Sequence, residues 1–434
     1  MQVFDLAIIG GGINGAAIAR DAAGRGHSVV LLEEQDLAGA TSSASSKLIH
    51  GGLRYLEQHA FRLVAESLAE REILLRTAPH LVQTLAFVLP QHLQLRPAWL
   101  IRAGLFLYDH LGALALAAQG RRSTMPRSRS LPLDPQGFGA GLDPGLTQGF
   151  LYHDCRTDDA RLVIANALAA AEHGARILTG TRVTGGTRRE GAWALQCAGP
   201  DGPASLHARV LVNAAGPWAE RVLGRIAGAV QRGRLRLVRG SHLVVRRIHD
   251  QPHACILQQP DGRVVFIIPY EKEYSLIGTT DVAMPQADDA ALRQVSASGE
   301  EIGYLCAAVN RYCRVQLTPA DVLWSFAGVR GLYDDGSANP SSVTRDYHLQ
   351  LDAPPGAGAP VLSVYGGKLT SARRFAERVL DRLAPWLGRT RGWTADRHFP
   401  GGDFASLPAL SAELSAEYPG LPQSLLESLM LRHG

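Results

Sequence analysis

The feature that most constrains the fold is the glycine-rich turn GGGING at 10–15. It follows the apolar run DLAIIG and precedes AAIARDAAGRG, a helix-like pattern of small residues closed by glycine. A second apolar run, HSVVLLE, comes next and ends in Glu33. Short apolar runs bounded by glycine turns are typical of buried strands, so this order predicts a strand–helix–strand unit.

Within such a unit the spacing GxGxxG predicts a dinucleotide site. Gly10 permits a tight turn, Gly12 lets the backbone approach a pyrophosphate, and Gly15 allows the helix to contact the strand. Asn14 belongs to the same turn, and the helix N-terminus offers N–H groups to phosphates. Glu33 would accept ribose hydroxyls and repel a 2′-phosphate, which disfavours NADP.

The rest of the chain alternates between two kinds of pattern. Strand, glycine turn and helix recur at 157–224 and 361–380, whereas 231–330 is rich in strand signals separated by turns. We therefore expect an α/β protein with a Rossmann-like FAD-binding domain in discontinuous segments, an inserted β-rich substrate domain and a short, possibly truncated helical C-terminal piece. The expected divisions are a nucleotide domain at 1–75, 150–225 and 345–390, a cap at 76–149 and 226–344, and a helical region at 391–434.

Charge and cysteine content exclude several classes of protein. The net charge of +4 is too small to argue for nucleic acid. Five cysteines without a CxxC spacing indicate reduced thiols in a cytoplasmic compartment, with no metal site. The start of the chain shows no signal-peptide pattern. Arg102, Asp109 and His110 interrupt the most apolar segment, 96–120, so no run reaches the ~20 apolar residues of a membrane helix.

A second unusual stretch is ATSSASSKLIHGGLRYLE at 40–57. Five hydroxyl side chains occupy six positions, followed by Lys47, His50, a glycine pair and Arg54-Tyr55. Lysine occurs only at 47, 272 and 368, so its use within this stretch indicates a geometric need that arginine does not meet. An anionic, ring-bearing ligand would suit these donors, and a solvated serine-rich loop is the alternative.

Two later motifs bear on which dinucleotide binds. NAAGPWA at 213–219 and GGKLT at 366–370 each combine a strand end with a glycine turn and a helix start. A longer cofactor lying over several strand ends would use both, and a helix N-terminus near a flavin would stabilise its reduced, anionic form. We therefore expect FAD, although a structural glycine pair at 366–367 remains an alternative.

Taken in order with RGSH, IGTTD, GVRGL and TRDY, these motifs resemble the FAD-dependent, aerobic and quinone-linked glycerol-3-phosphate dehydrogenases from about residue 4 to about 400. The resemblance implies oxidation of sn-glycerol 3-phosphate to dihydroxyacetone phosphate by hydride transfer from C2 to FAD, with electrons passed to a membrane quinone. The alternatives are a glycerophosphate oxidase that uses oxygen, another FAD-dependent amine or amino-acid oxidase, and a non-catalytic flavin-binding protein.

The resemblance also implies roles for individual residues. His242 in RGSH is the expected base and His50 its competitor. Salt bridges to neighbouring aspartates would explain Arg330 and Arg345 about as well as phosphate binding does. The expected catalytic residues are His242, Arg330, Lys368 and Arg54. The expected substrate-binding residues are Arg54, Tyr55, Thr279, Arg330 and Arg345. The expected cofactor-binding residues are Gly10, Gly12, Asn14, Gly15, Glu33, Thr41, Ser42, Ser46, Lys47, His50, Gly51, Val183, Ala215, Gly216, Gly367, Lys368, Leu369 and Thr370.

Expectations about the surface and the chain ends also come from the resemblance. It implies a homodimer attached to the inner face of the cytoplasmic membrane. The apolar and basic residues of 96–122 resemble an interfacial surface, and a buried helix is the alternative. GVRGL carries Gly331 where the family has proline, so a looser backbone is expected there. The chain stops in mid-helix, which suggests a fragment or a short form.

Overall fold

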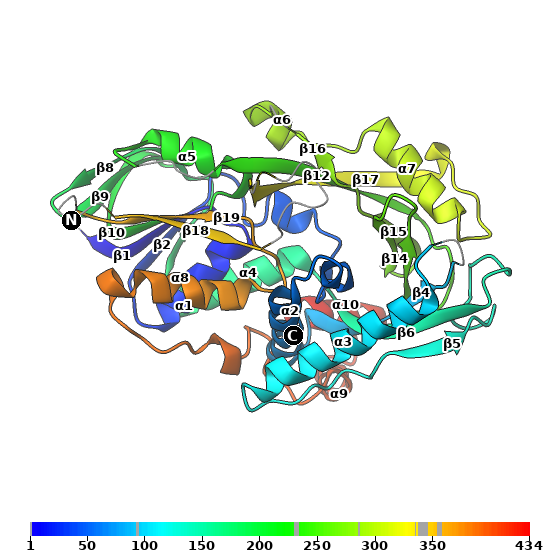
Figure 1. The fold of residues 1–434 in the computed structure, drawn as a ribbon. Coiled ribbons are helices and arrows are strands. Elements are labelled where there is room, and N and C mark those ends of the chain that lie inside the picture. Colours follow the sequence, from blue (N-terminus) through cyan, green and yellow to red (C-terminus); the bar gives the residue numbers. More distant parts are fainter. Residues whose placement is uncertain are drawn as a thin grey trace.

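The computed structural model describes residues 2–92, 95–229, 234–284, 287–334, 336, 346–353 and 358–434. Within these residues the strands form two sheets that lie side by side, with helices covering their outer faces (Figure 1). The helices are α1 (Ile13–Gly24), α2 (Phe61–Thr77), α3 (Ala98–Ala117), α4 (Asp159–Glu172), α5 (Ala219–Arg225), α6 (Asp289–Arg293), α7 (Gly299–Asn310), α8 (Ala372–Leu387), α9 (Leu407–Glu417) and α10 (Gln423–His433).

The first sheet is built around a parallel core. Neighbouring strands run in the order β7-β2-β1-β10-β19, all parallel, and β8 and β9 extend the β10 side as an antiparallel meander. Its strands are β1 (Val3–Ile9), β2 (Val29–Leu32), β7 (Arg176–Leu178), β8 (Arg182–Arg189), β9 (Ala192–Gly199), β10 (Gly202–Asn213), β11 (Ile226–Ala227), β18 (His348–Asp352) and β19 (Val361–Tyr365).

Small residues let helices pack closely on this sheet. α1 is rich in alanine and glycine, most of it is buried, and it contacts both α4 and α8. An apolar cluster joins these helices to β1, β2 and β10, and a second cluster fills the opposite face beneath β8, β9 and α5. Burial on both faces explains why β2 and the second half of β1, after Asp5, are uninterrupted apolar runs.

The second sheet is mostly antiparallel and lies beside the first. Strands follow the order β16-β12-β15-β14-β13-β4-β6-β3, with β17 paired to β12 and β5 to β6. α7 packs on one face, and α2 and α3 contribute to the apolar cluster on the other. Its strands are β3 (Leu48–Ile49), β4 (Val82–Pro90), β5 (Arg129–Pro132), β6 (Gln148–Thr157), β12 (Leu235–Arg246), β13 (Ala254–Gln258), β14 (Val264–Tyr270), β15 (Tyr274–Gly278), β16 (Val282–Ala283) and β17 (Val322–Tyr333).

The predicted fold class is confirmed, and several details differ from expectation. The expected domain boundary at residue 150 falls inside β6, a strand of the second sheet. Gly331 lies inside β17 opposite Leu237, and its carbonyl accepts a hydrogen bond from Gly366 N at 2.8 Å, so the backbone there is held.

The segment expected to be too polar for a membrane helix forms α3. Among the described residues, this 20-residue helix is the one long and apolar enough to cross a membrane by length and composition. It is docked on the protein, however, because it buries Ile101, Leu105 and Tyr108 against the second sheet and α2. Trp99 and Phe106 remain exposed on its outer side.

Candidate active site

A cavity of about 400 Å³ opens where the carboxyl ends of β1, β2, β10 and β19 meet the second sheet. Parallel strands end at the same edge of a sheet, so the motifs that follow them converge there. The residues after these strands are Gly10, Glu33, Ala214 and Gly366, and all four line the cavity. The far wall comes from β17 and from Thr279 and Asp281 after β15.

The glycine turn after β1 is shaped by two close approaches. A Cβ on Gly15 would lie 1.9 Å from the carbonyl oxygen of Gly10, and a Cβ on Gly10 would lie 2.5 Å from that of Ala214. Gly10 also has a φ of +110°, which side chains rarely adopt. Gly10 and Gly12 line the cavity, whereas Gly15 lies behind them at the helix–strand contact predicted for it.

Glu33 closes this turn from the neighbouring strand. Its carboxylate accepts hydrogen bonds from the backbone N–H of Gly11 at 2.6 Å and of Gln35 at 2.7 Å. These bonds fix the carboxylate at the cavity edge, where it can also meet a ribose.

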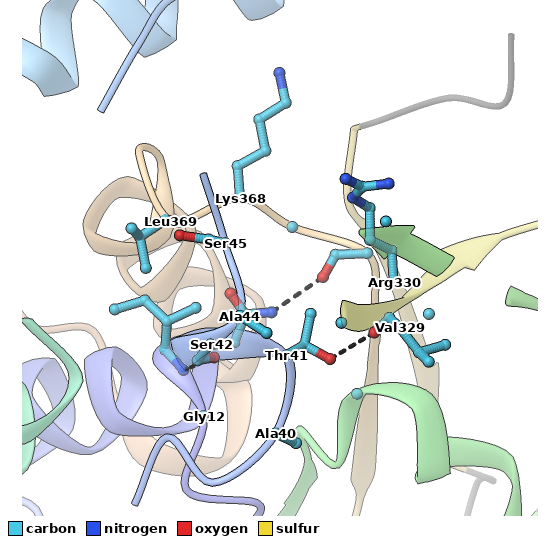
Figure 2. Close-up of a pocket in the computed structure, with 18 of the residues that line it drawn as sticks. Gly12, Ala40, Thr41, Ser42, Ala44, Ser45, Val329, Arg330, Lys368 and Leu369 are labelled. Atoms are coloured by element: carbon cyan, nitrogen blue, oxygen red, sulfur yellow. Dashed lines mark hydrogen bonds between the residues drawn. The ribbon is translucent and has the colours of Figure 1, made fainter. Parts of the chain in front are cut away.

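The serine-rich loop runs along the cavity floor between the two sheets. The hydroxyl of Thr41 donates to the carbonyl of Val329 in β17 at 2.5 Å, and that of Ser42 accepts from the N–H of Ile13 at 3.0 Å (Figure 2). Thr41, Ser42 and Ser46, which the sequence predicts to bind the cofactor, line the cavity. The loop therefore joins the start of α1 to the second sheet, which a solvated loop would not do.

The GGKLT motif is tied to the first turn. The side-chain amide of Asn14 donates to the carbonyl of Gly366 at 3.0 Å, and a Cβ on Gly367 would lie 2.8 Å from Asn14 Nδ2. Lys368, Leu369 and Thr370 follow and line the cavity. Val183, Ala215 and Gly216, also predicted to contact the cofactor, line it too.

Besides Gly15, two residues predicted to bind the cofactor do not line the cavity. Lys47 Nζ forms an ion pair with Asp159 at 2.6 Å and donates to the carbonyl of Ser43. The backbone N–H of Gly51 donates to the hydroxyl of Tyr108 in α3 at 2.8 Å. Both residues fix the loop from behind, and their partners are too distant in sequence to have been foreseen.

The end of the cavity nearest the second sheet carries positive charge. Arg54, Tyr55, Thr279, Arg330 and Lys368 all line it, and Lys368 Nζ lies 3.9 Å from the centroid of the Tyr55 ring. Figure 2 shows the side chains of Arg330 and Lys368 extending on the same side of the serine-rich loop. Arg345 lies outside the described residues.

Arg330 has a salt-bridge partner, although not the neighbours considered from the sequence. Its Nη1 donates to Asp281 at 2.8 Å, and Arg54 Nη1 lies 3.9 Å from the other oxygen of the same carboxylate. Asp281 is the final residue of the IGTTD motif. Asp281 was not among the residues predicted from the sequence, and its partner Arg330 lies 49 residues further along the chain.

The two candidate bases occupy different positions. His242 is 1% exposed, does not line the cavity, and stacks on Phe326 while its Nε2 lies 2.8 Å from the Ser46 hydroxyl. His50 lines the cavity itself. The geometry therefore favours His50 over His242, contrary to the order expected from the sequence.

Both imidazoles are neutral at ordinary pH. Burial lowers the pKa of His50 to about 4, with a further contribution from the positive charge of Lys368. Burial, aided by Arg330 and Lys47, lowers the pKa of His242 to about 3. A neutral imidazole has a free nitrogen that can accept a proton.

A buried carboxylate holds the strands behind this end in place. Glu301 at the start of α7 accepts hydrogen bonds from the hydroxyls of Ser241 at 2.8 Å and Thr280 at 2.6 Å, and pairs with Arg239 at 2.7 Å. These contacts join the RGSH and IGTTD motifs. Thr280 is consequently occupied with structure rather than with a ligand.

The residues present fit FAD. Trp218 lines the cavity, and its buried Nε1–H has no partner among the described residues; the same holds for Asn14 Oδ1. Buried polar atoms are rarely left without a partner, so both indicate a ligand with hydrogen-bonding groups. The glycine turn accommodates a pyrophosphate. Trp218 was not predicted, because only Ala215 and Gly216 of NAAGPWA were expected to contact the cofactor.

The comparisons with known proteins agree with this geometry. Residues 5–373 match the family model described as FAD dependent oxidoreductase. The chain is 49% identical over 427 residues to the glycerol-3-phosphate dehydrogenase of Pseudomonas aeruginosa, covering 98% of this chain and 80% of that protein. It is 48% identical over 430 residues to the D-erythritol 1-phosphate dehydrogenase of Brucella abortus, covering 98% of this chain and 83% of that protein.

A solved structure is similar over the whole chain. The glycerol-3-phosphate dehydrogenase from Bacillus halodurans, complexed with FAD, superimposes with a TM-score of 0.75 at 27% sequence identity. The match covers 100% of this chain and 76% of that one.

Proposed function

Because the chain belongs to the FAD dependent oxidoreductase family and, within it, to the glycerol-3-phosphate dehydrogenases, we propose that it oxidises sn-glycerol 3-phosphate to dihydroxyacetone phosphate. The predicted family and the predicted cofactor, FAD, are confirmed. The observation that carries the substrate is the set of three cations, Arg54, Arg330 and Lys368, at one end of the cavity.

The three cations suit a phosphate group. Guanidinium N–H groups form paired, charge-assisted hydrogen bonds with phosphate oxygens, and an ammonium adds a movable donor. Lys368 comes from the loop after β19 and Arg330 from β17, so the anion would be held between the two sheets. Holding the phosphate there fixes the distance of the neighbouring carbon atoms from the rest of the cavity.

His50 is the residue we assign to accept the proton of the C2 hydroxyl. It lines the cavity and is neutral, because burial and Lys368 lower its pKa. Lys368 and the hydroxyl of Thr279 are placed to stabilise negative charge on the substrate oxygen. Bound FAD supplies the two-electron acceptor, held by the glycine turn, Glu33, the serine-rich loop and residues 366–370.

We also propose that a membrane quinone takes the electrons, with α3 at the membrane surface. The exposed apolar residues Trp99, Leu100, Phe106 and Leu114 on this helix support the proposal. The basic part of the expected surface contributes less, because Arg96 pairs with Glu57, Arg102 donates to Ser128, and Arg121 pairs with Asp396.

Anaerobic titration of the FAD-loaded protein with sn-glycerol 3-phosphate tests the substrate. We expect stoichiometric bleaching of the visible flavin band by this compound, and none by glycerol or by amino acids. Glycine and proline matter as controls, because glycine oxidases and a proline dehydrogenase share the fold at 20% identity or less. Persistence of the band with every phosphate ester would contradict the proposal.

Two further comparisons separate the alternatives. D-erythritol 1-phosphate belongs in the titration, since a relative of almost equal identity is named for that substrate. Faster bleaching by it would assign the longer polyol phosphate. Reoxidation of the bleached protein by a soluble quinone, against reoxidation by oxygen, would then distinguish a dehydrogenase from an oxidase.

A further inference from the structure

The cationic end of the cavity contains a carboxylate, Asp281, whose negative charge does not help to attract an anion. Asp281 lines the same cavity as Arg54, Arg330 and Lys368, and its side chain is 8% exposed. It accepts a hydrogen bond from Arg330 Nη1 at 2.8 Å, and its second oxygen lies 3.9 Å from Arg54 Nη1. A negative charge beside a bound phosphate is repulsive, so its presence requires another reason.

The position of the Arg330 guanidinium depends on the backbone at Gly240 as well as on its ion pair with Asp281. Arg330 in β17 lies opposite Val238 in β12, so Gly240 is its diagonal neighbour on the same face of the sheet. A Cβ on Gly240 would lie 2.4 Å from Arg330 Nη2. Glycine in the RGSH motif therefore leaves the space that the guanidinium occupies, and Asp281 closes that space from the other side.

We propose that Asp281 is a positioning residue that holds the guanidinium of Arg330, and with it that of Arg54, in the orientation that receives a divalent phosphate group. The identity of the anion rests on the proposed function. Guanidinium has five N–H donors, so a bond to Asp281 leaves others to face the cavity. A long side chain that is held before binding loses less conformational freedom when the anion arrives, which favours affinity.

The charge of the ligand matters as well as its shape. A phosphate monoester carries about two negative charges and a monocarboxylate such as acetate carries one, so cations that are held in position bind the phosphate more strongly.

The test compares FAD-loaded wild type with Asp281→Asn and Gly240→Ala. Charge alone predicts that Asp281→Asn binds anions more tightly, since a negative charge is removed. Positioning predicts the opposite: a rise of about tenfold to 100-fold in KM for sn-glycerol 3-phosphate, with kcat within about threefold. The dissociation constant of inorganic phosphate, measured by calorimetry, should weaken by a similar factor, while acetate binds weakly throughout.

Gly240→Ala displaces the same guanidinium without changing any charge. It should reproduce the effect of Asp281→Asn, and the double variant should be little worse than the more affected single variant, because both act on Arg330. Asp352→Asn is the matched control. Asp352 pairs with Arg188 at the same 2.8 Å, both side chains are similarly shielded, and neither lines the cavity. It should leave KM and phosphate affinity unchanged.

The outcomes separate this proposal from the proposed function. Unchanged or tighter phosphate binding in Asp281→Asn would overturn the positioning role, even if glycerol 3-phosphate is a good substrate. Wild type that binds phosphate, loses affinity on Asp281→Asn and oxidises no glycerol 3-phosphate would refute the function alone. Loss of flavin, or a lower melting temperature than the Asp352→Asn control, would assign Asp281 a structural role and overturn the proposal.

Discussion

The two ends of the cavity are built by different means. The cofactor end is made from main chain: the turn after Gly10, the N–H groups at the start of α1, and the loops after β10 and β19. The substrate end is made from charged side chains on the second sheet and on the loops that reach it. The cofactor end depends on the close approach of main-chain segments. The substrate end depends on ion pairs between a few charged side chains.

This difference predicts different sensitivities to mutation. Backbone proximity fails when any side chain is added, whatever its charge, because hard-sphere contact cannot be relieved without moving the strand. A charged network fails when one partner is removed, because the remaining charges reorient or lose their orientation. The following substitutions separate the two cases.

The largest effect is expected at the cofactor end, from Gly15→Val. Its Cβ would lie 1.9 Å from the carbonyl oxygen of Gly10, so α1 must move away from β1 and the phosphate-binding turn is lost. We expect FAD affinity to fall more than about 100-fold, visible as protein purified without the flavin band. Gly303→Ala in α7 is the control, since a Cβ there meets no atom within 4 Å. A full complement of flavin in Gly15→Val would contradict the description of this end.

The next largest effect concerns the two histidines. His50→Gln should lower kcat by about 100-fold to 10,000-fold, the usual contribution of a general base, with flavin retained. His242→Gln should lower kcat less than about tenfold, because His242 lies behind Ser46 and does not line the cavity. Steady-state kinetics of both variants decide between them, and the reverse ranking would restore the assignment made from the sequence.

The pH dependence of kcat sharpens the same comparison. A base must be neutral to accept a proton, and an imidazole is neutral above its pKa. Because the pKa of His50 is lowered to about 4, kcat should stay level from pH 8 down to pH 6 and fall only in more acidic solution. Saturating substrate is required, since a phosphate ester itself titrates near pH 6. An acid limb centred at the ordinary histidine value near pH 6.5 would contradict the assignment.

The smallest kinetic effect is expected from Lys47→Met. Lys47 pairs with Asp159, whose side chain is fully buried. Among the described residues, removal of Lys47 leaves this carboxylate with hydrogen bonds from Ser45 and Ala160 alone. The free energy of unfolding should fall by about 3 kcal/mol, measured by denaturant unfolding, while kcat/KM changes less than about threefold. Lys368→Met should do the opposite: about 100-fold lower kcat/KM with little change in stability. Equal kinetic losses in both variants would show that Lys47 reaches the ligands.

The same division explains what could be predicted. The first strand–helix–strand unit, the glycine turn and the discontinuous α/β organisation were predictable from the sequence, because glycine spacing and apolar runs express local conformational needs. The order of the later motifs indicated the family. The predicted cofactor-binding residues Glu33, Thr41, Ala215 and Leu369 line the cavity.

Which charged residues face the cavity became clear only from the three-dimensional arrangement of the strands and loops. Lys47 and Lys368 are the same type of residue, and both lie in motifs. Lys47 pairs with Asp159, 112 residues away, behind the serine-rich loop, whereas Lys368 lines the cavity. His50 and His242 differ in the same way, and Arg330 depends on Asp281, 49 residues earlier. Local backbone conformation depends on a few neighbouring residues and can therefore be predicted from the sequence. Ion pairs depend on which distant strands the fold brings together.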